Sequence, residues 1–471
     1  MDLLLKKYRI LFASILILTI GYWCLLIFNI PILQSLWYWF WELNYKPLKE
    51  IWLLPLLIVA SIIVLYFIKK NNKRTIANII LLILLGFSIQ LGFGFIEGRG
   101  IYGLKDRLML TGHSEFARLA TSENDIGFIA SNYESLLDSN RLGKFPKSKP
   151  PGTLLTYMFF QKISNIINPV QSIDDKFERF TTFASFWFPL LCYFALVPLY
   201  LISKKFLCES AIFPCLLYIF IPNVTLSTLN LDQALYPTII LICMLFIINT
   251  FSKKSIKYAI LSGIFIYISI YISFSLVPML VFYFLIAMSY FILEKNKKVE
   301  YKQYLKIIAI VFLSFIIMQL IFYFSFNYNI IERYTNAIQF HSDWKVWVPT
   351  FKKTLYFAFL NSIEFACWVG IPITILYFTN IFYSASSIYN KSFNLIDLLS
   401  LSLIFVIITT ALLGKTKAET ARLWIFFVPI ICFLATIEII KISKKKWLTL
   451  YLIIFLQFIT IIIIKVYQDY H

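Results

Sequence analysis

The sequence predicts an all-α polytopic membrane protein, with about 13 transmembrane helices and a large external loop in its first half that carries interfacial helices. Apolar residues make up 60% of the 471 residues and charged residues only 14%, too few to cover a soluble protein of this size. Glycine and proline number 14 and 16, which argues against collagen-like or disordered chains. In a membrane protein, the net charge of +19 is expected to reflect Lys and Arg in the loops between helices. No nucleic acid is expected as a partner.

Each transmembrane helix needs about 20 consecutive apolar residues. A further segment, Thr153–Ile167, is shorter and carries Gln161 and Lys162, so it is a weak candidate to cross. The apolar runs that are long enough begin near Ile10, Ile51, Ile76, Phe180, Leu207, Leu235, Ile256, Leu276, Leu305, Leu355, Ile396, Leu423 and Trp447.

Loop charges decide how the chain is oriented, because short cytoplasmic loops are enriched in Lys and Arg. If the N-terminus is cytoplasmic and Thr153–Ile167 does not cross, most Lys and Arg of the short loops fall inside, including the basic segments 69–74 and 441–446. If Thr153–Ile167 crosses, most of the later ones fall outside. We therefore predict that Thr153–Ile167 is an interfacial or re-entrant helix on the external face.

This orientation divides the chain into three parts. Residues 1–95 form N-terminal transmembrane helices, residues 96–180 form one external loop with juxtamembrane helices, and residues 181–471 form the main helix bundle. A connector needs only a few residues, so a long polar loop on a membrane scaffold is predicted to carry function. An inert surface loop is the alternative.

The first candidate patch is the stretch Thr111–Ala120 within this loop. Its apolar residues share one face of a predicted helix, and Glu115 lies in the first turn, where the helix dipole favours a carboxylate. Glu115 could act as a general base toward a hydroxyl acceptor. Glu115 could equally pair with Arg118 at i+3, and Arg118 is also a candidate to bind substrate. His113 is interpreted as a capping or interface residue more readily than as a catalyst.

The second candidate patch is a lysine placed directly before two prolines and a glycine. Pro150 and Pro151 hold the backbone extended, and Pro151 suits the first turn of the helix that follows. Lys149 is thereby presented beside a helix N-terminus at the lipid–water boundary, which is a good site for a phosphate. A snorkelling interface lysine is the alternative.

Two more candidates lie at other predicted external helix ends. Asp232 opens the span that runs through Tyr236, where it could cap the helix or bind substrate. Arg422 lies where an apolar run begins, and an arginine that faces a membrane bundle is a functional hypothesis by default. An interface anchor is the alternative for Arg422.

Nucleotide and metal motifs are missing from the sequence. It contains no Walker loop, GxGxxG, GxSxG or HExxH, and its seven cysteines include no CxxC and no Cys/His pair at ligand spacing. No cofactor is therefore identified, and the sequence leaves open whether a divalent metal takes part.

Three short motifs resemble those of the GT-C superfamily of multispan glycosyltransferases, which includes protein O-mannosyltransferases and lipid A aminoarabinose transferases. They are GHSEFARLA after a transmembrane helix, SKPPG at the start of an interfacial helix, and ETARLW entering a late helix. The resemblance covers about residues 76–440, and the long loop 96–180 is similar to the family's first external loop.

The resemblance implies transfer of a sugar from a polyprenyl-phosphate donor to a lipid, glycan or protein acceptor, with inversion. It places Glu115 as the acid that activates the acceptor and Lys149 as the ligand of the donor phosphate. Independently of the resemblance, Arg422 could offset negative charge on the leaving phosphate together with Lys149. Relatives commonly carry an Asp-containing motif where this chain has His113 and Glu115, so the base could also be His113, or the chain could be a non-catalytic relative. The implied location is a bacterial cytoplasmic membrane with the active site on its periplasmic face.

Two other classes of protein compete with this interpretation. A polymerase or ligase of the O-antigen type also uses lipid-linked sugars, but its large loop is expected late in the chain, where residues 326–353 form only a shorter one. A flippase or transporter for lipid-linked sugars would show internal repeats and charged residues in the middle of its spans. The sequence has no internal repeat and few mid-span charges.

Overall fold

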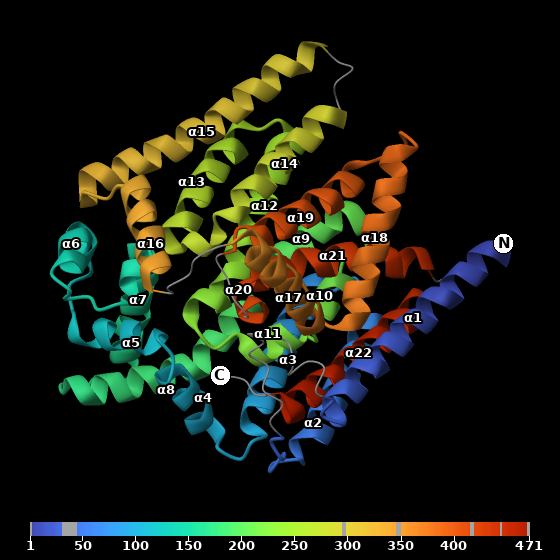
Figure 1. The fold of residues 1–471 in the computed structure, drawn as a ribbon, viewed down its shortest axis with the longest axis horizontal. Helices are drawn as coiled ribbons and strands as arrows, with labels where there is room; N and C mark the ends of the chain where they lie inside the picture. Colours follow the sequence, from blue (N-terminus) through green and yellow to red (C-terminus); the bar gives the residue numbers. More distant parts are fainter. Residues whose placement is uncertain are drawn as a thin grey trace. The chain divides into compact units, whose positions relative to one another are not determined.

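The computed structural model describes residues 2–30, 45–293, 298–344, 350–414, 419–442 and 445–468, with the side chains of residues 2–7, 232 and 298–300 left aside. Within these ranges the regular elements are helices, with no β-strand among them (Figure 1). Eleven of the described helices are long and apolar enough to cross a membrane. The predicted fold class, an all-α multi-pass membrane protein, is therefore confirmed.

Two compact units make up the chain, and each is assembled from separate stretches of sequence. Unit 1 comprises Met1–Gly103, Pro189–Thr228 and Phe351–His471, and unit 2 comprises Leu104–Phe188 and Leu229–Thr350. Most of the predicted external loop therefore packs with the helices that follow residue 228.

Unit 1 is built around α21 (Val428–Ile442), because 89% of the 18-residue apolar segment Ile425–Ile442 that contains it is buried. α21 packs against α9, α10 and α18, whereas α1 and α22 run side by side (Figure 1). The other elements of unit 1 are α1 (Asp2–Ile27), α2 (Leu53–Lys70), α3 (Thr75–Phe95), α9 (Leu196–Leu207), η2 (Cys208–Ser210), α10 (Phe213–Tyr218), α11 (Pro222–Ser227), α17 (Phe351–Val369), α18 (Ile371–Tyr389), α19 (Leu395–Leu412), α20 (Thr420–Leu423), η4 (Ile425–Phe427) and α22 (Lys446–Tyr467).

Unit 2 combines membrane-length helices with the short helices of the loop. α13 packs between α12 and α15, and only 11% of the apolar 18-residue segment of α15 is buried, so most of that helix is exposed. From the end of α15, α16 returns toward α7 and α5 (Figure 1). The elements are α4 (Gly100–Met109), α5 (His113–Ser122), α6 (Ile126–Asp138), η1 (Pro146–Ser148), α7 (Pro151–Ile167), α8 (Ile173–Tyr193, which continues into unit 1), α12 (Leu231–Lys253), α13 (Ile256–Ile272), η3 (Phe274–Leu276), α14 (Pro278–Leu293), α15 (Lys298–Phe326) and α16 (Ile330–Trp344).

The run that begins near Leu207 differs from the single span predicted for it. It forms η2, α10 and α11, and a proline stands in the first turn of each of the last two, at Pro214 and Pro222. Proline restarts a helix and removes a backbone donor, and such a broken segment is tolerated at membrane depth where protein surrounds it. Residues 213–227 are accordingly buried.

The run that begins near Leu355 was predicted to be a single transmembrane helix, but it forms two helices. Gly370 separates α17 from α18 with a φ of +94°, a conformation that side-chain-bearing residues rarely adopt. Of the two, only α18 is among the eleven candidate spans, and α13 is too short for that set at 17 residues. The broken Leu207 run and the short α13 are the two of the thirteen predicted runs that are missing from the eleven candidate spans.

The weak fourteenth segment is the helix α7, whose limits agree with the prediction. It begins at Pro151, ends at Ile167, and is not among the eleven candidate spans. Its buried side includes Leu154, Tyr157 and Met158, which pack on the neighbouring helices of unit 2. Its location at the membrane surface stays a prediction.

Candidate functional site

The Glu115 carboxylate ties helix α5 to the segment that precedes α7. The backbone N–H groups of Lys144 and Phe145 donate to Glu115 Oε1 and Oε2 at 2.9 and 2.7 Å. Glu115 lies in the first turn of α5, as predicted, and is half-buried. Each carboxylate oxygen has two acceptor positions, so one remains on each oxygen for a further donor such as a substrate hydroxyl.

Two glycines permit this close contact. A Cβ on Gly143 would lie 1.9 Å from Glu115 Oε1, and the residue has a φ of +76°. A Cβ on Gly112 would lie 1.6 Å from the ring of Phe145, which covers the start of α5. A side chain at Gly112 or Gly143 would displace the Phe145 ring or the Glu115 carboxylate, and at Gly143 it would also be strained by the positive φ. The GHSE stretch is therefore built to receive residues 143–145.

Lys149 lies just beyond these residues, between η1 and α7. Its backbone is extended, with φ −127° and ψ 157°, and Pro151 occupies the first turn of α7, as the sequence predicts. Tyr133 of α6 donates a hydrogen bond from its hydroxyl to the carbonyl of Pro146 at 3.1 Å. The lysine is thus held by a fixed backbone on both sides. Its side chain is half-buried.

The glycine of the SKPPG motif places α7 against the end of α13. A Cβ on Gly152 would lie 2.2 Å from the carbonyl oxygen of Tyr271 and 2.9 Å from the Cα of Ile272. The next residue, Thr153, donates from Oγ1 to the carbonyl of Ile272 at 2.7 Å. The Pro-Pro-Gly part of the motif therefore has a structural role, namely docking the N-terminus of α7.

The start of α12 lies at the same end of α13. The Tyr236 hydroxyl and the Ser273 hydroxyl form a hydrogen bond of 2.6 Å. Asn230 is the N-cap position of α12, which places Asp232 in the first turn rather than at the cap. The Asp232 side chain lies outside the described residues. The starts of α7 and α12 therefore both contact the same end of α13 within unit 2.

A buried arginine fixes the segment before Lys149. Arg333 of α16 donates to Glu134 Oε2 at 3.1 Å and to the carbonyl of Lys147 at 2.7 Å, and its side chain is only 4% exposed. It thereby joins α16, α6 and η1. From the sequence, Arg333 was interpreted only as one of the charged residues of the late external loop 326–353. Its contacts with Glu134 and Lys147 were therefore not predicted. The amphipathic pattern of residues 330–344 was the only signal present.

Burial raises the pKa of the Glu134 carboxyl, and the Arg333 guanidinium opposes this by lowering it. The nearby carboxylates of Glu332 and Asp138 raise the pKa further. Burial and the ion pair with Arg333 therefore act in opposite directions on the pKa of this half-buried carboxyl.

Exchange of Arg333 for alanine is expected to destabilise the protein by about 2–3 kcal/mol, because it leaves the half-buried Glu134 carboxylate and the carbonyl of Lys147 without their cation. Arg141→Ala is the matched control: its pair with Glu123 has an N–O distance of 2.9 Å, but the Arg141 side chain is 51% exposed. That exchange is expected to cost under about 1 kcal/mol. Thermal unfolding of the purified variants in detergent distinguishes them, and equal losses would contradict the buried clamp.

The loss of stability caused by Arg333→Ala is expected to depend on pH. Without the cation the pKa of Glu134 rises further above its unfolded value, so stability is lost as pH rises through the folded pKa and regained as pH falls toward the unfolded value of about 4.3. The unfolding temperature relative to wild type, measured from about pH 8 to about pH 5, should therefore improve on acidification. Adding Glu134→Gln should remove this dependence. A deficit that is constant with pH would contradict the assignment to Glu134.

The remaining predicted residues occupy different surroundings. His113 is buried at the start of α5, with its ring centroid 6.1 Å from that of Phe116. Arg118 is exposed and stacks over Phe177 at 4.4 Å, and the two described side chains of Arg118 and Glu115 form no ion pair with each other. Arg422 belongs to unit 1, where it pairs with Glu419 at 3.0 Å.

Unit 2 therefore brings Glu115, Lys149 and the start of α12 into one connected region, whereas Arg422 belongs to the other unit. Among the residues that the structure describes, no group of three His, Cys, Asp or Glu side chains is arranged to hold a metal. A carboxylate and an ammonium on fixed backbone are chemically suited to hydroxyl activation and to binding a phosphate.

Comparison with known proteins adds no assignment to this geometry. No protein-family model matches the chain, and no curated protein matches it at a significant level.

Proposed function

We propose that the protein is an integral membrane glycosyltransferase, which transfers a sugar from a polyprenyl-phosphate donor to an acceptor hydroxyl on the external face of the membrane. The observation that carries the proposal is the attachment of the GHSE stretch to residues 143–145, which lie shortly before the SKPPG stretch. Glu115 binds the backbone of Lys144 and Phe145, and Lys149 follows at the start of a docked helix. This supports one site that joins a carboxylate to a phosphate-binding ammonium.

The reaction needs only these groups and the donor's own activation. Glu115 takes the proton of the acceptor hydroxyl as its oxygen attacks the anomeric carbon of the sugar. The bond between that carbon and the phosphate oxygen breaks, and polyprenyl phosphate leaves with the bonding electron pair. The ammonium of Lys149 offsets the negative charge that develops on the phosphate, and the displacement inverts the anomeric centre.

An apolar groove in unit 2 supports a lipid-linked donor. It has a volume of about 290 Å³ and lies among α12, α13, α14 and α15. Its lining consists of aliphatic and aromatic side chains, which suit an isoprenoid chain. The residues that line it are Ile247, Phe251, Ile266, Leu280, Tyr283, Phe284, Ala287, Ile308, Val311, Phe312 and Phe315.

The proposal extends to Asp232, in the first turn of α12, as a ligand of the substrate. A cell-envelope glycan, lipid or protein is the acceptor, and the bacterial cytoplasmic membrane, with the site on its periplasmic side, is the location.

The test is transfer by the purified protein in lipid nanodiscs. Radiolabelled sugars on polyprenyl phosphate are supplied with a panel of lipid, glycan and protein acceptors, and products are separated from the donor. Donor-dependent labelling of an acceptor, with release of polyprenyl phosphate, is expected. Movement of labelled donor across proteoliposomes without transfer would contradict the proposal and indicate a flippase.

A further inference from the structure

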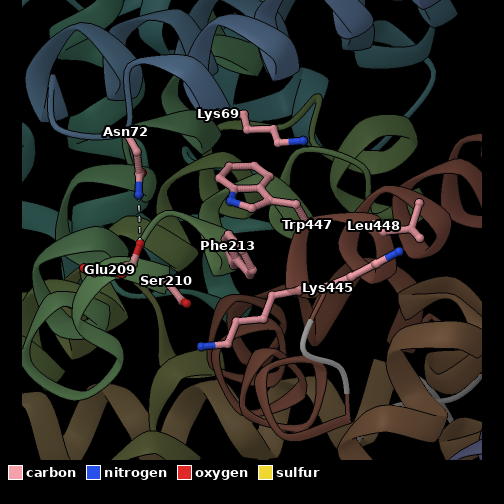
Figure 2. A pocket seen from close by; sticks show the side chains of 9 residues that line it. Lys69, Asn72, Glu209, Ser210, Phe213, Lys445, Trp447 and Leu448 are labelled. Atoms are coloured by element: carbon pink, nitrogen blue, oxygen red, sulfur yellow. Dashed lines mark hydrogen bonds between the residues drawn. The ribbon is translucent and has the colours of Figure 1, made fainter.

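A second, chemically different pocket lies in unit 1. It has a volume of about 550 Å³ and is formed by the end of α2, the turn after it, η2, α10 and the start of α22 (Figure 2). It is lined by Lys69, Asn72, Glu209, Ser210, Phe213, Lys445, Lys446, Trp447 and Leu448.

Direct contacts hold the walls of this pocket together. The rings of Phe213 and Trp447 meet edge to face, with centroids 4.8 Å apart, and Asn72 donates from Nδ2 to the carbonyl of Glu209 at 3.0 Å (Figure 2). These contacts join α10 to α22 and the α2–α3 turn to η2. The pocket is therefore formed by the packing of the unit.

The lining of the pocket favours an anion. The ammonium groups of Lys69, Lys445 and Lys446 outnumber the single carboxylate, that of Glu209. α22 begins at Lys446 without a side-chain cap, so the positive end of a 22-residue helix adds to the lysines. Lysines beside a helix N-terminus bind phosphate well.

An exposed apolar stripe begins at the pocket and indicates a lipid. Leu448 lines the pocket and is 64% exposed, and Leu452 and Phe455, at i+4 and i+7 on the same face of α22, are 36% and 60% exposed. Tyr451, over whose ring Lys69 lies at 5.6 Å, belongs to the aromatic residues typical of a membrane–water boundary. A phosphate in the pocket would have acyl chains along this stripe.

We propose that this pocket binds the phosphate group of an anionic phospholipid, with the acyl chains along the exposed face of α22. The proposal is independent of the glycosyltransferase reaction. The loop charges assign this end of unit 1 to the cytoplasmic side, where the leaflet is rich in anionic lipid and basic pockets between helices bind headgroups.

The test compares lipid retention by the full-length protein in neutral detergent, measured by native mass spectrometry. Wild type is expected to retain phosphatidylglycerol over phosphatidylcholine. The double variant Lys69→Ala/Lys446→Ala should bind phosphatidylglycerol roughly tenfold more weakly or worse. Lys253→Ala/Lys257→Ala removes the same charge from residues 252–257, which the loop charges also assign to the cytoplasmic side, and should bind as wild type does. If the first double variant does not purify, each single exchange is measured with the same criterion.

Inorganic phosphate and glycerol 3-phosphate are added in a further experiment, as competitors of the bound lipid. Neither should displace the lipid at millimolar concentration, because neither has acyl chains. The proposal is overturned if both lipids are retained equally, if the two double variants lose phosphatidylglycerol to the same extent, or if the free phosphates bind in a lysine-dependent way while the lipid does not.

Discussion

Lys149→Ala is expected to lower the turnover of sugar transfer by about 10²–10³-fold, because it removes the cation that offsets charge on the leaving phosphate. The backbone at this position should keep its extended conformation, since Pro150 and Pro151 on its C-terminal side fix it. The unfolding temperature should therefore change little. Steady-state transfer rates and thermal unfolding of the same preparation measure the two effects separately.

Lys147→Ala is the matched control for this exchange. Lys147 carries the same charge two residues away, but its ammonium contacts Asn140 and lies 5.7 Å from the ring centroid of Phe340. Its exchange should leave the transfer rate within about threefold of wild type, as expected for a charge remote from the leaving group. If the two lysine variants lose activity equally, or neither does, the assignment of Lys149 to the donor phosphate is wrong.

Glu115→Gln tests the other half of the same site. Loss of the general base should lower turnover by about 10²–10⁴-fold. The amide keeps only one acceptor oxygen for the N–H groups of Lys144 and Phe145, so a moderate loss of stability should accompany the loss of rate. Glu123→Gln, in an exposed pair with Arg141, is the control and should affect neither. Full activity of a destabilised Glu115→Gln protein would show that the carboxylate is purely structural.

The second large effect is expected from Gly152→Ala. The added Cβ would lie 2.2 Å from the Tyr271 carbonyl oxygen and 2.8 Å from its carbon, and backbone atoms cannot move aside as a flexible side chain can. The start of α7 must therefore separate from α13, with loss of the Thr153 hydrogen bond to Ile272. An overpacking cost of about 3 kcal/mol or more should lower the unfolding temperature by roughly 5–10 °C.

Gly21→Ala provides the control for this exchange. Nothing lies within 4 Å of a Cβ at Gly21, which is in the interior of α1, so alanine should leave stability unchanged or slightly raised. Transfer should also fall in Gly152→Ala, because Lys149 moves with the N-terminus of α7. A Gly152→Ala protein with wild-type stability and activity would contradict the docking role of the SKPPG motif.

Local sequence patterns predicted the features that local physics controls. The excess of apolar residues predicted the all-α membrane fold, and the two prolines before residue 152 predicted the start of α7 at Pro151. The helix that carries Glu115 begins at His113, in agreement with the apolar periodicity of residues 111–120. Each of these depends on residues within about one turn of each other.

Features that depend on distant residues were not predictable. The partners of Arg333 lie 199 and 186 positions earlier in the chain, so nothing near Arg333 distinguishes it from a surface arginine. Gly370 divides an apolar run into two helices through its φ of +94°, and a single glycine in such a run does not predict a helix break. Hydrogen bonds from Lys144 and Phe145, rather than the expected neighbour Arg118, satisfy Glu115.

The most direct test of the central claim, that the Glu115–Lys149 region faces the outside of the membrane, is cysteine labelling of intact cells. Ser139→Cys introduces a thiol at an exposed position of this region, and Cys208 is an exposed native cysteine at the end predicted to be cytoplasmic. A membrane-impermeant maleimide should label residue 139 in intact cells and Cys208 only after permeabilisation. Labelling of Cys208 with protection of residue 139 would contradict the account.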